Sequence, residues 1–291
     1  MPDSTRPAGP RPPSSVLVTG AAGNLGREVV DRLRAHGVRV RSLVRHQTPP
    51  RAGVESVVGD LTDPAAVREA LVGIDAVFLI WPLLDSASAH APVAELAAAA
   101  PRVVYLSTTA IDDGAARQSD PIAQVHMDVE VLLHEADLRP VVLRSDTLAS
   151  NARGWASQLR MGDVVSGLDI ARTAVVDERD VADAAVAVLL AHRPDQGVHV
   201  LTGPEVLSRA EQVAHLGSAL RRRLRFQALP ADLARSRMLA DGRPEPLVEA
   251  LIAASVRRPE SNRVTDHIER LTGRPAGTFA QWAVDHAADF N

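Results

Sequence analysis

The feature that most restricts the fold of this chain is a set of three evenly spaced glycines behind a short apolar run. Residues 15–19 are β-rich, and Gly20, Gly23 and Gly26 follow at intervals of three. From residue 24 to residue 36 the apolar side chains recur with the period of a helix. The sequence therefore predicts a strand, a tight turn and a helix, in that order.

This strand–turn–helix unit predicts a binding site for a dinucleotide. Gly20 permits a tight turn, Gly23 lets the backbone approach a pyrophosphate, and Gly26 lets the helix lie close to the sheet. Free N–H groups at the start of the helix attract phosphate. The alternative is a glycine-rich turn without a ligand. The residues expected to hold the cofactor here are Gly20, Ala22, Gly23, Asn24, Leu25 and Gly26.

The coenzyme is predicted from the residue that would meet the adenosine ribose. An NAD site places an acidic residue about 20 positions after the glycines. Arg45 stands there instead, and no acidic residue lies between Arg39 and Val54. Because a guanidinium suits a 2′-phosphate, we expect NADP, with NADPH preferred over NADH. The alternative is that Arg45 is a solvated loop cation.

The first half of the chain alternates strand and helix patterns. Further strands are expected at 38–44, 54–58, 75–80, 102–107 and 139–144, and helices near 63–72, 87–100 and 121–136. The nearly continuous apolar strands are typical of a parallel sheet buried on both faces. We therefore expect a Rossmann-type, doubly wound α/β domain over residues 14–150, behind a proline-rich disordered tail over residues 1–13.

The second half is expected to form a smaller mixed α/β lobe over residues 151–291 that binds the substrate. Residues 170–192 are expected to return to the first domain, with a strand near 173–176 and a helix at 178–191. A strand at 198–201, a helix at 208–220 and two helices between 230 and 256 follow. The last two helices meet at a Gly-Arg-Pro stop, after which Thr278 and Gln281 have capping-box spacing.

Composition excludes several classes of function. The chain contains neither cysteine nor lysine, which excludes a thiolate nucleophile, a cysteine-bound metal and a lysine Schiff base. Its ten histidines include no pair four residues apart, so no metal is expected. A net charge of -4 gives no field for nucleic acid, and no apolar stretch is long enough for a membrane span. We expect a cytoplasmic protein with a small-molecule substrate, and a homodimer remains open.

Several motifs in order resemble those of the short-chain dehydrogenase/reductase superfamily, in its extended and atypical branches. Beyond Thr19-Gly20-x-x-Gly23-x-x-Gly26, the chain has a Gly-Asp-Leu ending at Leu61, Ile80-Trp81-Pro82 after the fourth strand, and Leu106-Ser107-Thr108 after the fifth. The resemblance implies that Asp60 and Leu61 meet the adenine, that Ile80 and Trp81 lie by the cofactor ribose, and that Ser107 is the active-site serine.

Within this superfamily the chain is most similar to the NmrA-like group, which contains quinone and triphenylmethane-dye reductases and redox-sensing regulators. The motifs that carry this similarity are His126-x-x-x-Glu130, Leu143-Arg144 and Asn151, and later Leu201-Thr202-Gly203-Pro204. The strand-to-helix segment 176–182 and the segment 271–275 also match.

The superfamily's catalytic Tyr-x-x-x-Lys pair is missing. The lysine position falls on His126 and the tyrosine position on Ile122, and the only tyrosine, Tyr105, lies inside a predicted strand. His126 is predicted to bind the nicotinamide ribose or donate a proton, and Ser107 to polarise a carbonyl group. The alternatives are a packing histidine and a serine that caps the strand end.

The missing acid decides which reaction is expected. A quinone or an enone accepts hydride into a delocalised system, so water can supply the proton. The sequence therefore predicts an NADPH-dependent reductase of a small planar activated acceptor, with Trp81, Asn151 and Trp155 binding the substrate. The tryptophans alternatively pack in the core. Two other functions remain open, namely a non-catalytic NADP(H)-sensing regulator and a non-redox isomerase, cyclase or dehydratase of a secondary metabolite.

Overall fold

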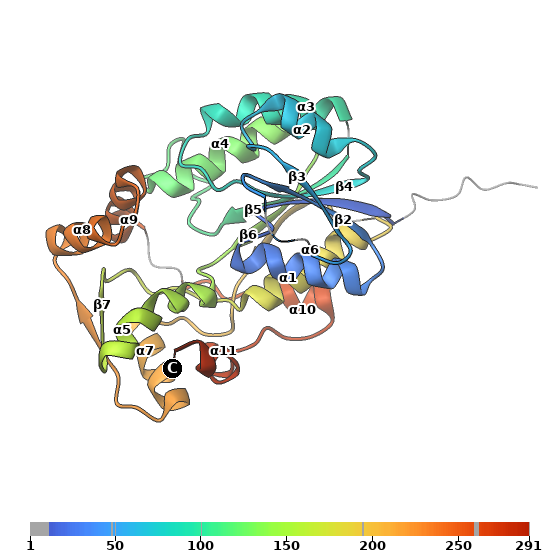
Figure 1. Ribbon diagram of the computed structural model, residues 1–291. Coiled ribbons are helices and arrows are strands. Elements are labelled where there is room, and N and C mark those ends of the chain that lie inside the picture. The colour runs from blue at the N-terminus through green and yellow to red at the C-terminus, as the bar shows by residue number, and fades with distance from the viewer. Residues whose placement is uncertain are drawn as a thin grey trace, which may run out of the picture.

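The centre of the protein is a seven-stranded, wholly parallel β-sheet (Figure 1). The computed structural model describes residues 12–47, 49, 51–99, 101–193, 195–258 and 262–290, so nearly all of the expected tail lies outside the described residues. The strand order is β3-β2-β1-β4-β5-β6-β8. The strands are β1 (Ser15–Thr19), β2 (Arg39–Val44), β3 (Val54–Val58), β4 (Ala76–Ile80), β5 (Arg102–Thr108), β6 (Val141–Ser145) and β8 (Gly197–Leu201).

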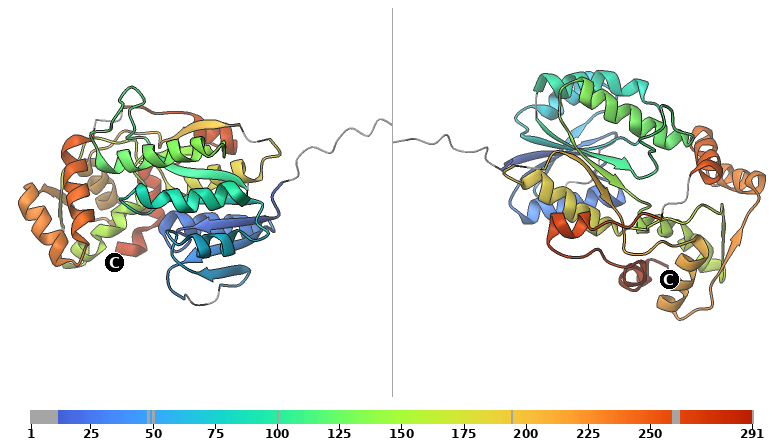
Figure 2. Two further views of the ribbon diagram at one scale, coloured as in Figure 1. Left: turned by 90° about the horizontal axis from the view of Figure 1, so that it is seen from above. Right: turned by 180° about the vertical axis from the view of Figure 1, so that it is seen from behind.

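Helices cover both faces of the sheet, as Figure 1 and the rear view in Figure 2 show. One face carries α1 (Asn24–Ala35) and α6 (Glu178–Leu190), and the other carries α2 (Pro64–Leu71), α3 (His90–Ala99), α4 (Pro121–Glu135) and the short η1 (Ala87–Ala89). Each face has its own buried apolar cluster, because both sides of the strands are apolar. The predicted Rossmann-type, doubly wound α/β fold is confirmed.

The strand order reverses between β1 and β4, and an open α/β sheet binds its ligand in a crevice beyond the carboxyl ends of the strands at such a switch point. The Thr19 side chain links β1 to β4 at that point. Its hydroxyl donates to the Ile80 carbonyl at 2.9 Å and accepts from the Ile80 amide at 2.7 Å. The glycine turn therefore leaves the sheet where an open α/β sheet binds its ligand.

Most of the later segments form a smaller group of elements beyond the carboxyl edge of the sheet, whereas α10 (His267–Thr272) packs against α6 on one face of the sheet (Figure 1). They include a two-stranded parallel sheet of β7 and β9, which the sequence did not predict. The bounds are η2 (Ala149–Trp155), α5 (Ala156–Met161), β7 (Val164–Gly167), α7 (Arg209–Leu220), β9 (Arg225–Ala228), α8 (Ala231–Ala240), α9 (Glu245–Arg257), α10 (His267–Thr272), α11 (Phe279–Asp285) and η3 (Ala287–Phe290).

Two local predictions are corrected here. Residues 173–176 are not a strand: they make only single bridges, between Leu148 and Val176 and between Thr173 and Leu207. The capping box at α11 is half formed, because Thr278 accepts from the Gln281 amide while the Gln281 side chain donates to Asp285. Among the described segments, every helix falls short of the length or apolarity that crossing a membrane requires.

Candidate active site

The glycine turn has the shape that a pyrophosphate site needs. Gly20 has φ +63°, in the region that favours glycine. A Cβ on Gly26 would lie 2.2 Å from the Gly20 carbonyl oxygen, so α1 rests directly on the turn. Gly23 is the N-cap, no side chain caps the helix, and its first turn has no acidic residue. The first-turn amides are therefore available to an anion, and the turn fits a dinucleotide.

The other predicted residues of this turn are placed around it. Ala22 is exposed beside Gly23, and Asn24 begins α1 and accepts from the Arg27 guanidinium at 3.2 Å. Leu25 is buried in the core below the turn and anchors the start of α1. The backbone of this segment thus faces the crevice while its apolar side chain holds it to the sheet.

Arg45 and Asp60 lie near one another at the ends of β2 and β3. Both are exposed, and Leu61 packs on the core behind them. The Thr62 amide and hydroxyl both donate to the Asp60 carboxylate and lower its pKa, and the positive charge of Arg45 lowers this pKa further. This edge of the crevice thus offers one cation and one fixed carboxylate.

Ile80 and Trp81 differ in their surroundings. Ile80 lies against the glycine turn, since a Cβ on Gly20 would touch its side chain at 3.3 Å. Trp81 is buried in the core cluster on the α2–α4 face, and its indole N–H donates to the Asp85 carbonyl at 3.1 Å. The substrate-binding role of Trp81 stays a prediction.

Ser107 belongs to a buried charged network between β5, α4 and β6. Its hydroxyl donates to Glu130, whose carboxylate also binds the Arg144 guanidinium through two hydrogen bonds of 3.0 and 2.7 Å. Arg144 in turn holds both oxygens of Asp113, at 2.8 and 2.9 Å. The Ser107 hydroxyl therefore already donates its proton in a hydrogen bond to the Glu130 carboxylate.

His126 pairs with the only tyrosine of the chain. The Tyr105 hydroxyl lies 2.8 Å from Nδ1 of His126, and Tyr105 is fully buried. Desolvation lowers the pKa of His126 to about 4, although the negative charges of Glu130 and Asp120 oppose this shift. The imidazole is therefore neutral at pH 7, and its Nδ1 is occupied while Nε2 is left for another partner.

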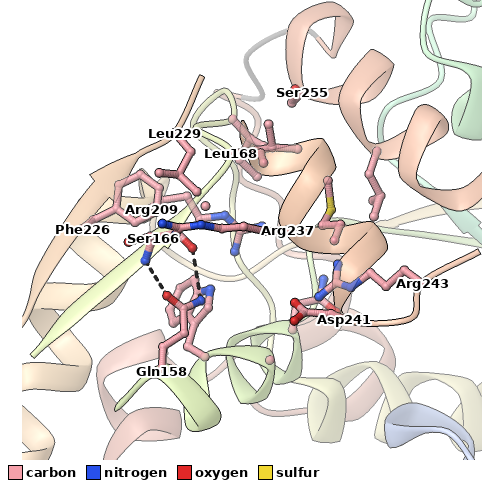
Figure 3. A pocket seen from close by; sticks show the side chains of 18 of the residues that line it. Gln158, Ser166, Leu168, Arg209, Phe226, Leu229, Arg237, Asp241, Arg243 and Ser255 are labelled. Atoms are coloured by element: carbon pink, nitrogen blue, oxygen red, sulfur yellow. Dashed lines mark hydrogen bonds between the residues drawn. The ribbon is translucent and has the colours of Figure 1, made fainter. Parts of the chain in front are cut away.

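A pocket of about 1060 Å³ opens beyond the ends of β5 and β6. It is bounded by α5, β7, β9, α8 and α9, and Figure 3 shows the side chains at that end, with Gln158 and Ser166 joined by two hydrogen bonds. Asn151 and Trp155 line it, as does Ile122, on which the sequence comparison is expected to place the superfamily's tyrosine. Ser107, His126 and Trp81 are not among its lining residues.

Two threonine hydroxyls that the sequence did not single out line the pocket at the sheet edge. Thr108 Oγ1 accepts from the Ala110 amide at 3.2 Å and keeps its own proton. Thr147 Oγ1 is buried and has no hydrogen-bond partner in the described part of the chain. A buried hydroxyl without a partner is costly unless a ligand or water meets it. Thr108 ends β5 and Thr147 follows the neighbouring β6, so both threonines line the pocket at the carboxyl ends of adjacent strands.

Comparisons with known proteins agree with this geometry. A family model described as NAD(P)H-binding matches residues 20–192. The chain is 36% identical over 282 residues to a (4-alkanoyl-5-oxo-2,5-dihydrofuran-3-yl)methyl phosphate reductase of Streptomyces griseus, covering 94% of this chain and 99% of the relative. It is 31% identical over 284 residues to an NAD(P)H azoreductase of Xenophilus azovorans, covering 94% and 99%.

A solved structure with the same fold is the triphenylmethane reductase of Citrobacter sp., with a TM-score of 0.74 and 21% identity over 94% of this chain and 99% of that chain. That reductase has also been solved with NADP(H). Since the family model matches more than half of the sequence and both relatives span nearly all of it, the chain belongs to the NAD(P)H-binding family.

Proposed function

We propose that the protein uses NADPH to reduce a small, planar, conjugated acceptor, such as an enone or a quinone, in the pocket beyond β5 and β6. The observation that carries this proposal is the pocket wall at the sheet edge, where Thr108 and the unpartnered Thr147 stand beside Ile122. The names of two relatives, one a reductase of a dihydrofuranone and one an azoreductase, support a conjugated acceptor.

The chain's own groups favour an acceptor that needs no protein acid. The reduced nicotinamide supplies a hydride when it is bound. Thr108 and Thr147 donate hydrogen bonds to the acceptor oxygen, where negative charge develops. Ile122 offers no proton, so the proton comes from water, and only an acceptor with a delocalised product anion reacts readily.

His126 and Ser107 position the groups around the reacting centre. Nε2 of the neutral His126 binds a ribose hydroxyl, with the ring held by Tyr105. Ser107, fixed by Glu130, holds the end of β5 so that Thr108 faces the pocket. Asn151 and Trp155, which also line the pocket, contact the acceptor.

The first test is turnover of NADPH with a panel of enones and quinones, with wild type and Thr147→Val. Valine has nearly the same shape as threonine but lacks the hydroxyl. We therefore expect kcat to fall about tenfold or more while the KM for NADPH is unchanged. The matched control is Thr173→Val, whose hydroxyl is also buried without a partner among the described residues but does not line the pocket. Absence of NADPH oxidation with every acceptor would refute the proposal.

The preference for NADPH is assigned to Arg45, the exposed cation at the end of β2. Arg45→Glu should weaken NADPH binding about tenfold or more and NADH binding far less, because the charge reversal acts on the 2′-phosphate. Calorimetric titration of both coenzymes measures this difference. Arg39→Glu, at the other end of β2, is the control and should leave both affinities unchanged. Equal losses for the two coenzymes would remove Arg45 from the 2′-phosphate site.

A further inference from the structure

The pocket is rich in arginine. Its lining includes Arg209 of α7, Arg237 of α8, Arg243 after α8 and Arg258 at the end of α9. Among the described residues, none of the three lining carboxylates forms an ion pair with these arginines. Asp120 caps α4, Asp163 pairs with Arg222, and Asp241 makes no ion pair.

Arg258 and Arg209 differ in how they are compensated. Arg258 binds the fully buried Asp146 carboxylate at 3.1 Å. Arg209 has no carboxylate within ion-pair distance among the described residues. Its polar contact there is a long one, 3.4 Å from Nη1 to Oε1 of Gln212. Arg237 and Arg243 also lack an ion pair among the described residues, but both are exposed. Arg209 is therefore the partly buried cation of the pocket that lacks an acidic partner.

Arg209 is held in place although it lacks an acidic partner. Its guanidinium carbon lies 5.4 Å from the centre of the Trp155 ring, in a cation–π contact. Desolvation and the nearby charge of Arg258 lower the pKa of Arg209 to about 10, while Asp169 opposes the shift. The group stays charged at neutral pH, in a place where charge is costly. An anion bound beside it would relieve that cost.

We infer that the acceptor carries an oxyanion, a phosphate monoester or a carboxylate, and that Arg209 binds it. This inference rests on the proposed function and specifies its substrate class. The planar guanidinium, which lies over the Trp155 ring, has the fork of N–H donors that suits both oxyanions. In Figure 3 Arg237 reaches from α8 into the same pocket and adds to the positive field.

The cofactor's own phosphates do not explain these arginines. The pyrophosphate is placed at the turn between Gly20 and Gly26 and the 2′-phosphate at Arg45, and none of these residues lines the pocket. The conjugated part of the acceptor is therefore assigned to Thr108 and Thr147, and its charged substituent to Arg209.

The test uses three acceptors on one scaffold, an enone bearing a hydroxymethyl group, its phosphate monoester and the matching carboxylate. Calorimetry gives the Kd of each for the NADP⁺-loaded protein, and kcat/KM is measured with NADPH. We expect at least one of the two anions to bind about tenfold or more tightly than the alcohol, and Arg209→Gln to remove most of that preference. The ratio of the two anions identifies the favoured one.

Controls separate a specific site from general charge and from misfolding. Arg223→Gln removes an exposed arginine that does not line the pocket and should keep the wild-type preference. Arg209→Lys keeps the positive charge but loses the forked guanidinium, and it should retain part of the preference for the anion. A melting temperature for each variant shows that it is folded.

The outcomes distinguish the two proposals. If an anion binds through Arg209 but no NADPH is consumed with any of the three compounds, the proposed reduction fails and the anion site stands. If wild type and Arg209→Gln discriminate equally between anion and alcohol, or neither discriminates, the anion site is wrong whatever the turnover.

Discussion

At the scale of single residues, His126 combines two properties that usually conflict. It is a titratable ring, yet its surroundings keep it neutral, because desolvation outweighs the attraction of Glu130 and Asp120. The Tyr105 hydroxyl fixes its Nδ1. A neutral, oriented imidazole is a good partner for a sugar hydroxyl and a poor proton donor at pH 7, which agrees with an acceptor protonated by water.

This arrangement predicts a pH dependence of stability. The pKa of His126 is about 4 in the folded protein, against the ordinary histidine value of 6.5 in the unfolded chain, so between these values only the unfolded chain binds the proton. The free energy of unfolding therefore falls as the pH drops below about 6.5. His126→Gln lacks this contribution. Between pH 7.5 and pH 5 its free energy of unfolding should therefore fall by about 2 kcal/mol less than that of wild type.

Urea unfolding at the two pH values measures this difference. His134→Gln, which removes an exposed histidine of the same helix, is the control and should lose as much stability on acidification as wild type. A loss in His126→Gln equal to that in wild type would mean that the folded protein accepts the proton on His126.

The sequence could place some of the site residues and not others, for a physical reason. Gly20 and Gly26 were identifiable because their neighbours along the chain, a strand and a helix, define their surroundings. Tyr105 and His126 lie on different elements, and their contact depends on how α4 packs on β5. Among the described residues, the Thr147 hydroxyl has no hydrogen-bond partner and Arg209 has no carboxylate partner, and no local sequence pattern records such an absence in space.

At the scale of elements, strands with continuous apolar runs were predictable and short ones were not. All seven strands of the main sheet fall within about two residues of the expected ranges. Burial on both faces accounts for the apolar runs of central strands such as β1 and β4, whereas the edge strand β3 is largely exposed. β7 and β9 have only four residues each, and β9 is the polar sequence RFQA with mostly exposed side chains. Nothing in their local composition distinguishes them from loops.

The segment 173–176 shows the opposite case, in which apolar residues do not make a strand. Its residues are buried, but its neighbours are loops rather than strands. Gly203 donates to the Ala174 carbonyl at 3.1 Å, and a Cβ on Gly203 would lie 1.9 Å from the Val175 carbonyl oxygen. The motif Leu-Thr-Gly-Pro thus has a packing reason for its glycine: two backbones cross there at close range.

At the scale of the whole molecule, one buried carboxylate joins the sheet to the last helix. Glu178 starts α6, which packs on the sheet beside α1, and its Oε2 accepts from the Trp282 indole of α11 at 3.0 Å and from the Ser150 amide at 3.1 Å. Arg153 lies 3.0 Å from Oε1 of the same carboxylate. The elements around the pocket are thereby tied to those that bind the cofactor.

This link predicts a large effect of a conservative change at Trp282. Trp282→Phe keeps an aromatic ring but removes the donor to a fully buried carboxylate, so the free energy of unfolding should fall by about 3 kcal/mol. Phe290→Leu trims the same aromatic cluster without breaking a hydrogen bond and should cost less. Urea unfolding followed by far-ultraviolet circular dichroism, in a double-mutant cycle with Glu178→Gln, isolates the contact. We expect a coupling energy of about 1 kcal/mol or more between the two sites, and additive losses would show that Glu178 and Trp282 do not hold these elements together.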